Sequence, residues 1–164
     1  MKTARERVIE WLRDIHAAEE QAHTLLRKTA SQLDGHAGFS AGLDRHGEVS
    51  KQQAARLKDC LEDLGEGTST LKVATGQASA LMQTLSGYVV GDEPVKALLA
   101  IASFTQMEAS SYRILSAGAR IAGLDSVTSL CRSHLAEEED FAQWLEAQTE
   151  PLTNAFLALE TAEA

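Results

Sequence analysis

Only two cysteines, two prolines and few aromatic residues occur among the 164 residues of the chain. Cys60 and Cys131 form neither a CxxC motif nor a second pair, which argues against a disulfide framework and against a thiolate metal site. We interpret both as buried apolar side chains. The low aromatic content and the many alanines and leucines favour packed helices.

Basic clusters and long apolar runs are also missing. The formal net charge of −9 repels phosphate backbones and anionic lipid surfaces, so nucleic acid is not an expected partner. The N-terminal stretch "MKTARERVIEWLRD" lacks the apolar core of a signal peptide, and no apolar run is long enough to span a bilayer. We therefore predict a cytoplasmic protein with no membrane partner.

Motifs of nucleophilic or phosphate chemistry are absent as well. The chain has no G-x-S-x-G sequence, no phosphate-binding loop and no pattern that marks an activated cysteine and histidine pair. Hydrolytic catalysis is therefore not expected.

The sequence does contain apolar residues repeated at intervals of three and four, which is the pattern of helices in a bundle. Glycine-rich turns such as "DGHAG" and "GEGTST" separate these stretches, and "GDEPVK" is a strong helix start, with Asp92 as N-cap and Pro94 in the first turn. The predicted helices cover residues 4–33, 39–64, 93–122 and 126–148.

Two further segments are weaker. Residues 70–89 are predicted to form a short crossover helix, and Pro151 is predicted to separate a short helical tail over residues 151–160. Short connections make the first two helices one antiparallel hairpin and the last two another. The fold class is thus all-α, a four-helix bundle in a single domain covering residues 1–164.

Three glutamates do not fit the apolar faces on which they lie. Glu19, Glu108 and Glu138 project inward from three helices, and distances from the turns place them at about the same level of the bundle. In "HLAEEEDFAQWL", Glu138 shares the stripe of the apolar residues, Glu137 lies at its edge and the next two acids point away. Buried carboxylates are costly unless they are protonated, hydrogen-bonded or neutralised by a cation.

Histidines accompany these carboxylates. His23, His46 and His134 lie on or near the same inward faces, and carboxylate oxygens together with imidazole suit iron, manganese or zinc. The alternative is that the glutamates reach the edge of the bundle and that the histidines are ordinary core residues, in which case no metal is bound.

Three stretches, "WLRDIHAAEEQAHTLL", "HGEVSKQQAARLKDCLEDLG" and "HLAEEEDFAQWLEAQTEPLTNAFL", resemble the YciE/YciF family of ferritin-like bacterial proteins. The resemblance covers roughly residues 8–160. It implies a ferritin-like bundle, a candidate dinuclear metal site, a homodimer and an association with stress responses, without a settled catalytic activity. By position, it makes Glu19, Glu108 and Glu138 the candidate metal ligands.

The chain also departs from this family. Val49 stands where the resemblance places a ligand glutamate, and Ser111 stands where it places a second acid of the third helix. A full di-iron site uses about four carboxylates. The interior histidines could complete a mononuclear or rearranged site, or the site has decayed and leaves a structural or partner-binding bundle. We do not expect an enzyme; if there is activity, the candidate is a metal-dependent oxidoreductase.

Overall fold

The computed structural model describes residues 1–33, 35–66 and 94–163, and these residues form four helices. They are α1 (Ala4–Gln32), α2 (Ala37–Asp63), α4 (Pro94–Ile121) and α5 (Asp125–Glu163). The predicted all-α fold class is confirmed. The predicted crossover helix over 70–89 and the predicted N-cap at Asp92 lie outside the described residues.

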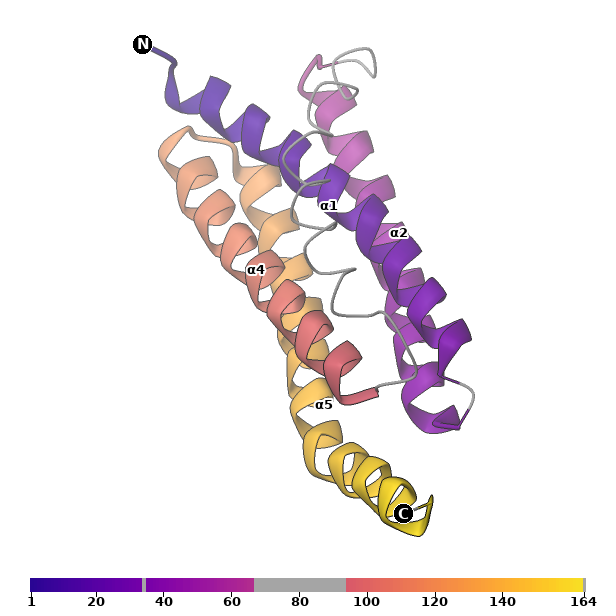
Figure 1. Cartoon of the computed structure of the whole chain (residues 1–164). Coiled ribbons are helices and arrows are strands. Elements are labelled where there is room, and N and C mark those ends of the chain that lie inside the picture. The colour runs from indigo at the N-terminus through magenta and orange to yellow at the C-terminus, as the bar shows by residue number, and fades with distance from the viewer. Residues whose placement is uncertain (34, 67–93, 164) are drawn as a thin grey trace.

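The helices form a four-helix bundle of two antiparallel hairpins (Figure 1). α1 packs against α2, α4 packs against α5, and the two hairpins meet mainly through α1 and α4. The turns of the two hairpins lie at opposite ends of the bundle, so α2 ends far from the point where α4 begins (Figure 1). This topology places α2 parallel to α4 and lets all four helices reach one central level.

Local sequence explains where α1 begins. Thr3 accepts a hydrogen bond from the backbone N–H of Glu6, and the Glu6 carboxylate accepts one in return from the backbone N–H of Thr3 at 2.6 Å. This capping box satisfies two N–H groups that the helix itself leaves without a partner. The same interaction orients α1 from its first turn.

The turn between α4 and α5 follows the sequence prediction. Gly123 has a φ of +69°, a left-handed conformation that glycine adopts without a steric cost. The backbone N–H of Leu124 donates to the carbonyl of Ala119 at 2.9 Å, which ends α4. A connection this short forces α5 to run back along α4.

The predicted end of the last helix near Gln148 is wrong, because α5 continues through Pro151 to Glu163. A proline inside a helix removes one backbone hydrogen bond and costs about 3 kcal/mol. Leu152 follows Phe141 and Leu145 on one helical stripe, and all three are buried in the same apolar cluster. This packing continues the helix past the proline, and the C-terminal part of α5 bends away from the bundle (Figure 1).

The core consists of two apolar clusters. The first contains Leu12, Ile15, Leu57, Leu61, Phe104, Tyr112, Leu115 and Val127 among others. The second lies towards the α1–α2 turn and contains Leu26, Phe39, Leu43, Ile101, Phe141, Leu145 and Leu152 among others. On every helix, buried polar residues occupy the positions between the two clusters. The polar layer that results is the candidate site.

None of the described helices combines the length and the apolar character that crossing a membrane requires.

The packing of Trp144 gives a test of the second cluster. The Trp144 indole stacks on Phe39 and Phe141, with ring centroids 5.7 and 5.6 Å apart, and a Cβ atom at Gly42 would overlap it. We expect Gly42→Ala to lower the free energy of unfolding by about 1–3 kcal/mol, because the stacked ring has no free space to enter.

Gly38 provides the matched control, since it lies in the same helix and a Cβ atom there meets nothing within 4 Å. Gly38→Ala should stabilise the chain by roughly 0.5–1 kcal/mol, because it removes backbone freedom from the unfolded state. Urea unfolding of both variants measures the difference. Equal effects would contradict the close packing of Trp144 on α2.

Candidate metal centre

All four helices contribute to the polar layer between the two apolar clusters. Its buried residues are Glu19 from α1, His46, Ser50 and Gln53 from α2, Glu108 from α4, and His134 and Glu138 from α5. Each lies one or two turns from apolar residues of both clusters. The 3.6-residue helical period therefore brings these polar side chains to the centre of the bundle.

Three carboxylates form the middle of this layer. Glu19, Glu108 and Glu138 each contribute an oxygen, and the three oxygens lie within 4.8 Å of one another. The exposed fraction of each residue is 1% or less. The sequence predicted that these three residues converge, and the structure brings them together.

Several ligand-type atoms in the layer have no hydrogen-bond partner among the described residues. One oxygen of each of the three glutamates is in this state, as are Gln53 Oε1 and His134 Nε2. Buried polar atoms are normally paired, and leaving one unpaired costs about 1–3 kcal/mol. Protons shared between the carboxyl groups, water or a cation would each satisfy these oxygens.

Burial and mutual repulsion govern the charge of the carboxylates. Burial raises the pKa of Glu108 well above its ordinary value, and the neighbouring Glu19 and Glu138 raise this pKa further. Burial and Glu138 also raise the pKa of Glu19, while a hydrogen bond from Tyr112 opposes that increase. Without a cation, burial and repulsion therefore favour the protonated forms of Glu19 and Glu108.

Tyr112 connects the carboxylates to His134. Its hydroxyl donates to Glu19 Oε1 at 2.6 Å and lies 3.0 Å from His134 Nδ1. With the phenol proton directed to an ionised Glu19, Nδ1 of His134 donates the second hydrogen bond and Nε2 keeps its lone pair. A proton on Glu19 would let the phenol donate to Nδ1 instead. Burial lowers the pKa of His134 to about 4, so this imidazole is neutral and does not offset the carboxylate charge.

His46 reaches the layer from α2. Its Nε2 lies 3.3 Å from Glu138 Oε2, and its ring stacks on Phe141 with centroids 3.6 Å apart. The stacking fixes the plane of the ring and so directs the nitrogen at the carboxylate. Its position is consistent with the sequence prediction, which placed His46 on the inward face.

His23 does not join the carboxylates. Its Nδ1 lies 2.8 Å from the carbonyl oxygen of Gly47, where α1 packs on α2. The structure therefore assigns it a contact between helices. It would have to leave that contact to become a ligand.

The α2 residue that faces the carboxylates is Ser50. Its exposed fraction is 0%, whereas Val49 is half-buried at the side of the helix. Ser111 on α4 is also half-buried, and its hydroxyl donates to the carbonyl of Met107 at 2.8 Å. Neither position at which the family resemblance places a further carboxylate, Val49 on α2 or Ser111 on α4, carries an acid in this chain.

A second polar group, which the sequence did not reveal, links α2 to α5 beside the layer. Glu137 accepts hydrogen bonds from the Arg56 guanidinium at 2.7 and 3.1 Å and from the Gln53 amide at 2.8 Å. Burial opposes ionisation of Glu137, but the hydrogen bonds from Arg56 and Gln53 outweigh it and lower its pKa. Spacing alone placed Glu137 at the edge of the stripe and gave no sign of its partners.

These observations fit one cation better than two. The three carboxylates supply hard, anionic oxygen ligands close together, and the imidazoles of His134 and His46 lie next to that group. Two cations bridged by so few carboxylates would leave an excess of positive charge in the core. The donors available therefore suit a single divalent ion.

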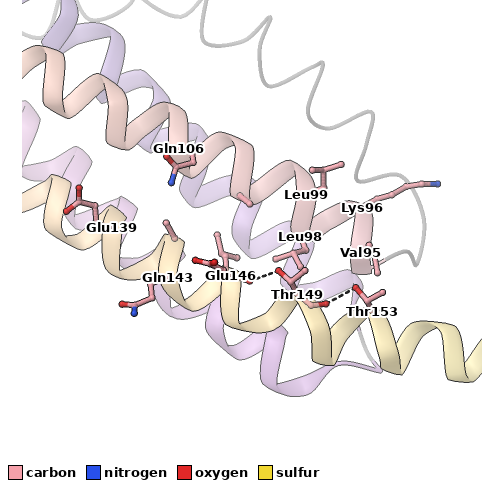
Figure 2. A pocket seen from close by; sticks show the side chains of 13 residues that line it. Val95, Lys96, Leu98, Leu99, Gln106, Glu139, Gln143, Glu146, Thr149 and Thr153 are labelled. Carbon is pink, nitrogen blue, oxygen red and sulfur yellow. Dashed lines mark hydrogen bonds between the residues drawn. The ribbon is translucent and has the colours of Figure 1, made fainter.

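Another cavity, a surface groove of about 700 Å³, lies between α4 and α5 (Figure 2). Apolar residues such as Leu98 and Leu99 line it, and the hydroxyls of Thr149 and Thr153 donate to carbonyls of their own helix. None of the three central glutamates lines the groove. It therefore adds no ligand to the polar layer.

The fold and the buried carboxylates define a ferritin-like helical bundle, and comparison with known proteins identifies its family. Residues 3–158 match a family described as a domain of unknown function, DUF892, and the chain belongs to this family. The resemblance to YciE/YciF proteins is thereby confirmed.

Three solved structures are similar to this chain. A Xanthomonas campestris protein has 31% sequence identity and a TM-score of 0.82, covering 98% of this chain and 99% of that one. The Escherichia coli stress protein YciF has 22% identity and a TM-score of 0.79, with coverage of 94% and 99%. YcfI from Rhodopseudomonas palustris, titled as a candidate structural protein, has 25% identity and a TM-score of 0.71, with coverage of 89% and 94%.

The raised pKa of Glu108 predicts how the stability of the metal-free protein depends on pH. The folded chain retains a proton that the unfolded chain releases as the pH rises above 4.5, the ordinary pKa of glutamate. The free energy of unfolding should therefore fall as the pH rises through the interval between 4.5 and the raised pKa of the folded state. Glu108→Gln should reduce this slope and stabilise the metal-free protein by about 1–3 kcal/mol at pH 8.

Urea unfolding at pH 5.5 and pH 8 with a chelator present measures this effect. Glu139→Gln is the matched control, because Glu139 lies on the surface of α5 and pairs only with exposed Arg113. It should change stability by less than about 1 kcal/mol. Because the lowered pKa of His134 gives the opposite slope in parent and variant alike, the parent is compared with Glu108→Gln at each pH. A parent whose stability relative to Glu108→Gln does not fall between these two pH values would contradict the raised pKa.

Proposed function

We propose that this protein binds one divalent metal ion per chain between Glu19, Glu108 and Glu138. The single observation that carries the proposal is the meeting of three buried carboxylates within 4.8 Å, each with one oxygen that lacks a partner among the described residues. A cation would neutralise the charge and satisfy these oxygens at once. Iron, manganese and zinc are the candidate ions, since imidazoles lie beside the oxygen ligands.

The chain's own residues would hold the carboxylates in position. The Tyr112 hydroxyl holds one oxygen of Glu19 by a hydrogen bond. The His46 ring, stacked on Phe141, contacts one oxygen of Glu138 through its Nε2 atom. Hydrogen bonds from neighbouring side chains to the ligand carboxylates orient those carboxylates and make metal binding tighter. The two apolar clusters above and below keep water from the layer. A bound iron or manganese ion would supply redox chemistry in this dry environment.

A second candidate function follows from the neutral residues on α2 and α4. Val49 and Ser111 stand where the family resemblance places further carboxylates, and neither is an acid. A bundle whose metal site has decayed would keep protons on its glutamates and act as a structural or partner-binding protein. This alternative predicts no metal affinity above that of the protein surface.

Family resemblance supports two further proposals, namely a homodimer and a role in stress responses. The E. coli structure is named as that of a stress protein, which describes that protein. Light scattering of the purified chain would test the dimer directly.

Metal loading tests the proposed function. Protein purified without an affinity tag is treated with chelator, loaded separately with Mn²⁺, Zn²⁺ or anaerobic Fe²⁺, and measured by elemental analysis after gel filtration. We expect about one ion per chain. Glu108→Gln should weaken binding by at least about 10-fold, because it removes a ligand from the group.

Glu139→Gln serves again as the control and should bind as the parent does, since this surface carboxylate lies outside the central group. Circular dichroism confirms that each variant is folded. If the folded parent retains no metal after gel filtration, the proposal is wrong and the structural bundle becomes the better account.

A further inference from the structure

The buried carboxylates raise the question of how a cation would reach them. The exposed fraction of Glu19, Glu108 and Glu138 is at most 1%, so no ion can reach them from solvent without the displacement of side chains. Helices α1 with α2, and α4 with α5, pack closely along their lengths. α2 and α5 approach each other least closely of the four neighbouring pairs. The interface between α2 and α5 is therefore the weakest barrier around the site.

Polar side chains bridge this interface. His46 contacts Glu138 at one level, and about two to three turns along α2 the Gln53 amide and the Arg56 guanidinium both bind Glu137. About a third of each of the Arg56 and Glu137 side chains is exposed to solvent, at 37% and 33%. Glu137 thus differs from the central glutamates, because it faces water and the polar layer at the same time.

Oxygen atoms continue inward from Glu137. The Gln53 side chain donates its N–H to Glu137, while its Oε1 atom is buried without a partner among the described residues. Ser50, nearly one turn earlier on α2, has a fully buried hydroxyl that interacts with Glu19 and lowers the pKa of that carboxyl. The charge of Glu137 also acts on Glu19, which places the two carboxylates within electrostatic reach of each other. A cation moving along this line would meet an oxygen ligand at each stage.

We propose that cations enter the site through the α2–α5 interface, an inference that rests on the proposed function. Glu137 first releases Arg56, then takes the ion from solvent and passes it inward. In the closed state the guanidinium binds both oxygens of Glu137 and covers it. Because about a third of each side chain is exposed, water can replace these hydrogen bonds when the pair opens. Arg56 then turns towards water, and Glu137, next to the ligand Glu138 in the sequence, becomes available to the ion. Glu137 is in this account a positioning residue for entry, whereas the three central glutamates are the ligands.

An entry residue and a ligand differ in their kinetics. A change in the entry path alters the rates of uptake and release by the same factor and leaves the dissociation constant unchanged, because the bound state is not affected. Loss of a ligand changes the dissociation constant. The two roles are therefore separable by measuring both rates.

Co²⁺ is the probe, because its visible absorption reports oxygen and nitrogen ligation. Stopped-flow mixing with the full-length chain gives the uptake rate, and mixing the loaded protein with EDTA gives the release rate. Arg56→Gln should accelerate both rates by about five-fold, since it removes the ion pair that closes the path. Glu137→Gln should slow both rates, because the path then loses its receiving carboxylate.

Two control variants separate the path from general charge effects. Arg113→Gln removes the same charge from the exposed Arg113–Glu139 pair and should leave both rates unchanged. Arg56→Lys keeps the charge but loses the bidentate contact, so its rates should fall between those of the parent and of Arg56→Gln. Circular dichroism verifies the fold of each variant.

The results distinguish the two levels of the proposal. Absence of Co²⁺ binding in the folded parent would overturn both the metal site and the entry path. Binding with the same rates in the parent, Arg56→Gln and Glu137→Gln would overturn the path alone. A changed dissociation constant in Glu137→Gln with unchanged uptake would also overturn it, since Glu137 would then belong to the site itself.

Discussion

The burial of three carboxylates at one level of the core is the constraint on which the rest of the structure depends. Glu108 and Glu138 meet within the α4–α5 hairpin, and Glu19 joins them when the two hairpins dock. The polar layer around them divides the core into two apolar clusters. The surrounding groups limit the cost of this burial, with Tyr112 donating to Glu19 and His46 contacting Glu138. The proposed cation would remove what remains of the repulsion.

Charge balance gives this arrangement a preferred stoichiometry. Three ionised carboxylates carry a formal charge of −3, which one divalent ion reduces to −1 and two ions would convert to +1. Excess positive charge in an apolar environment is as costly as excess negative charge. Because Ser50 and Ser111 are neutral, this chain lacks the carboxylates with which a second ion could be neutralised. The chain lacks acids that the family resemblance leads one to expect, and this difference changes the electrostatics of the site but leaves the fold unchanged.

The sequence predicted the helices and the inward glutamates because both depend on local periodicity. A helical projection separates Glu138 from its acidic neighbours without any knowledge of the fold. Long-range packing determined what the projection missed. The burial of Leu152 overrode the break expected at Pro151. The Arg56–Glu137 contact joins side chains from two hairpins, which spacing along one helix cannot reveal.

The division of the ligands between the hairpins has a consequence for folding. Contacts within each hairpin join residues close in the chain, and such local contacts form quickly. Glu19 belongs to the first hairpin, whereas Glu108 and Glu138 belong to the second. The repulsion between Glu19 and the other two therefore opposes the docking of one preformed hairpin on the other and leaves the hairpins themselves unaffected. A cation that binds only the docked state would act on the last step of assembly, making the two halves unfold as one unit.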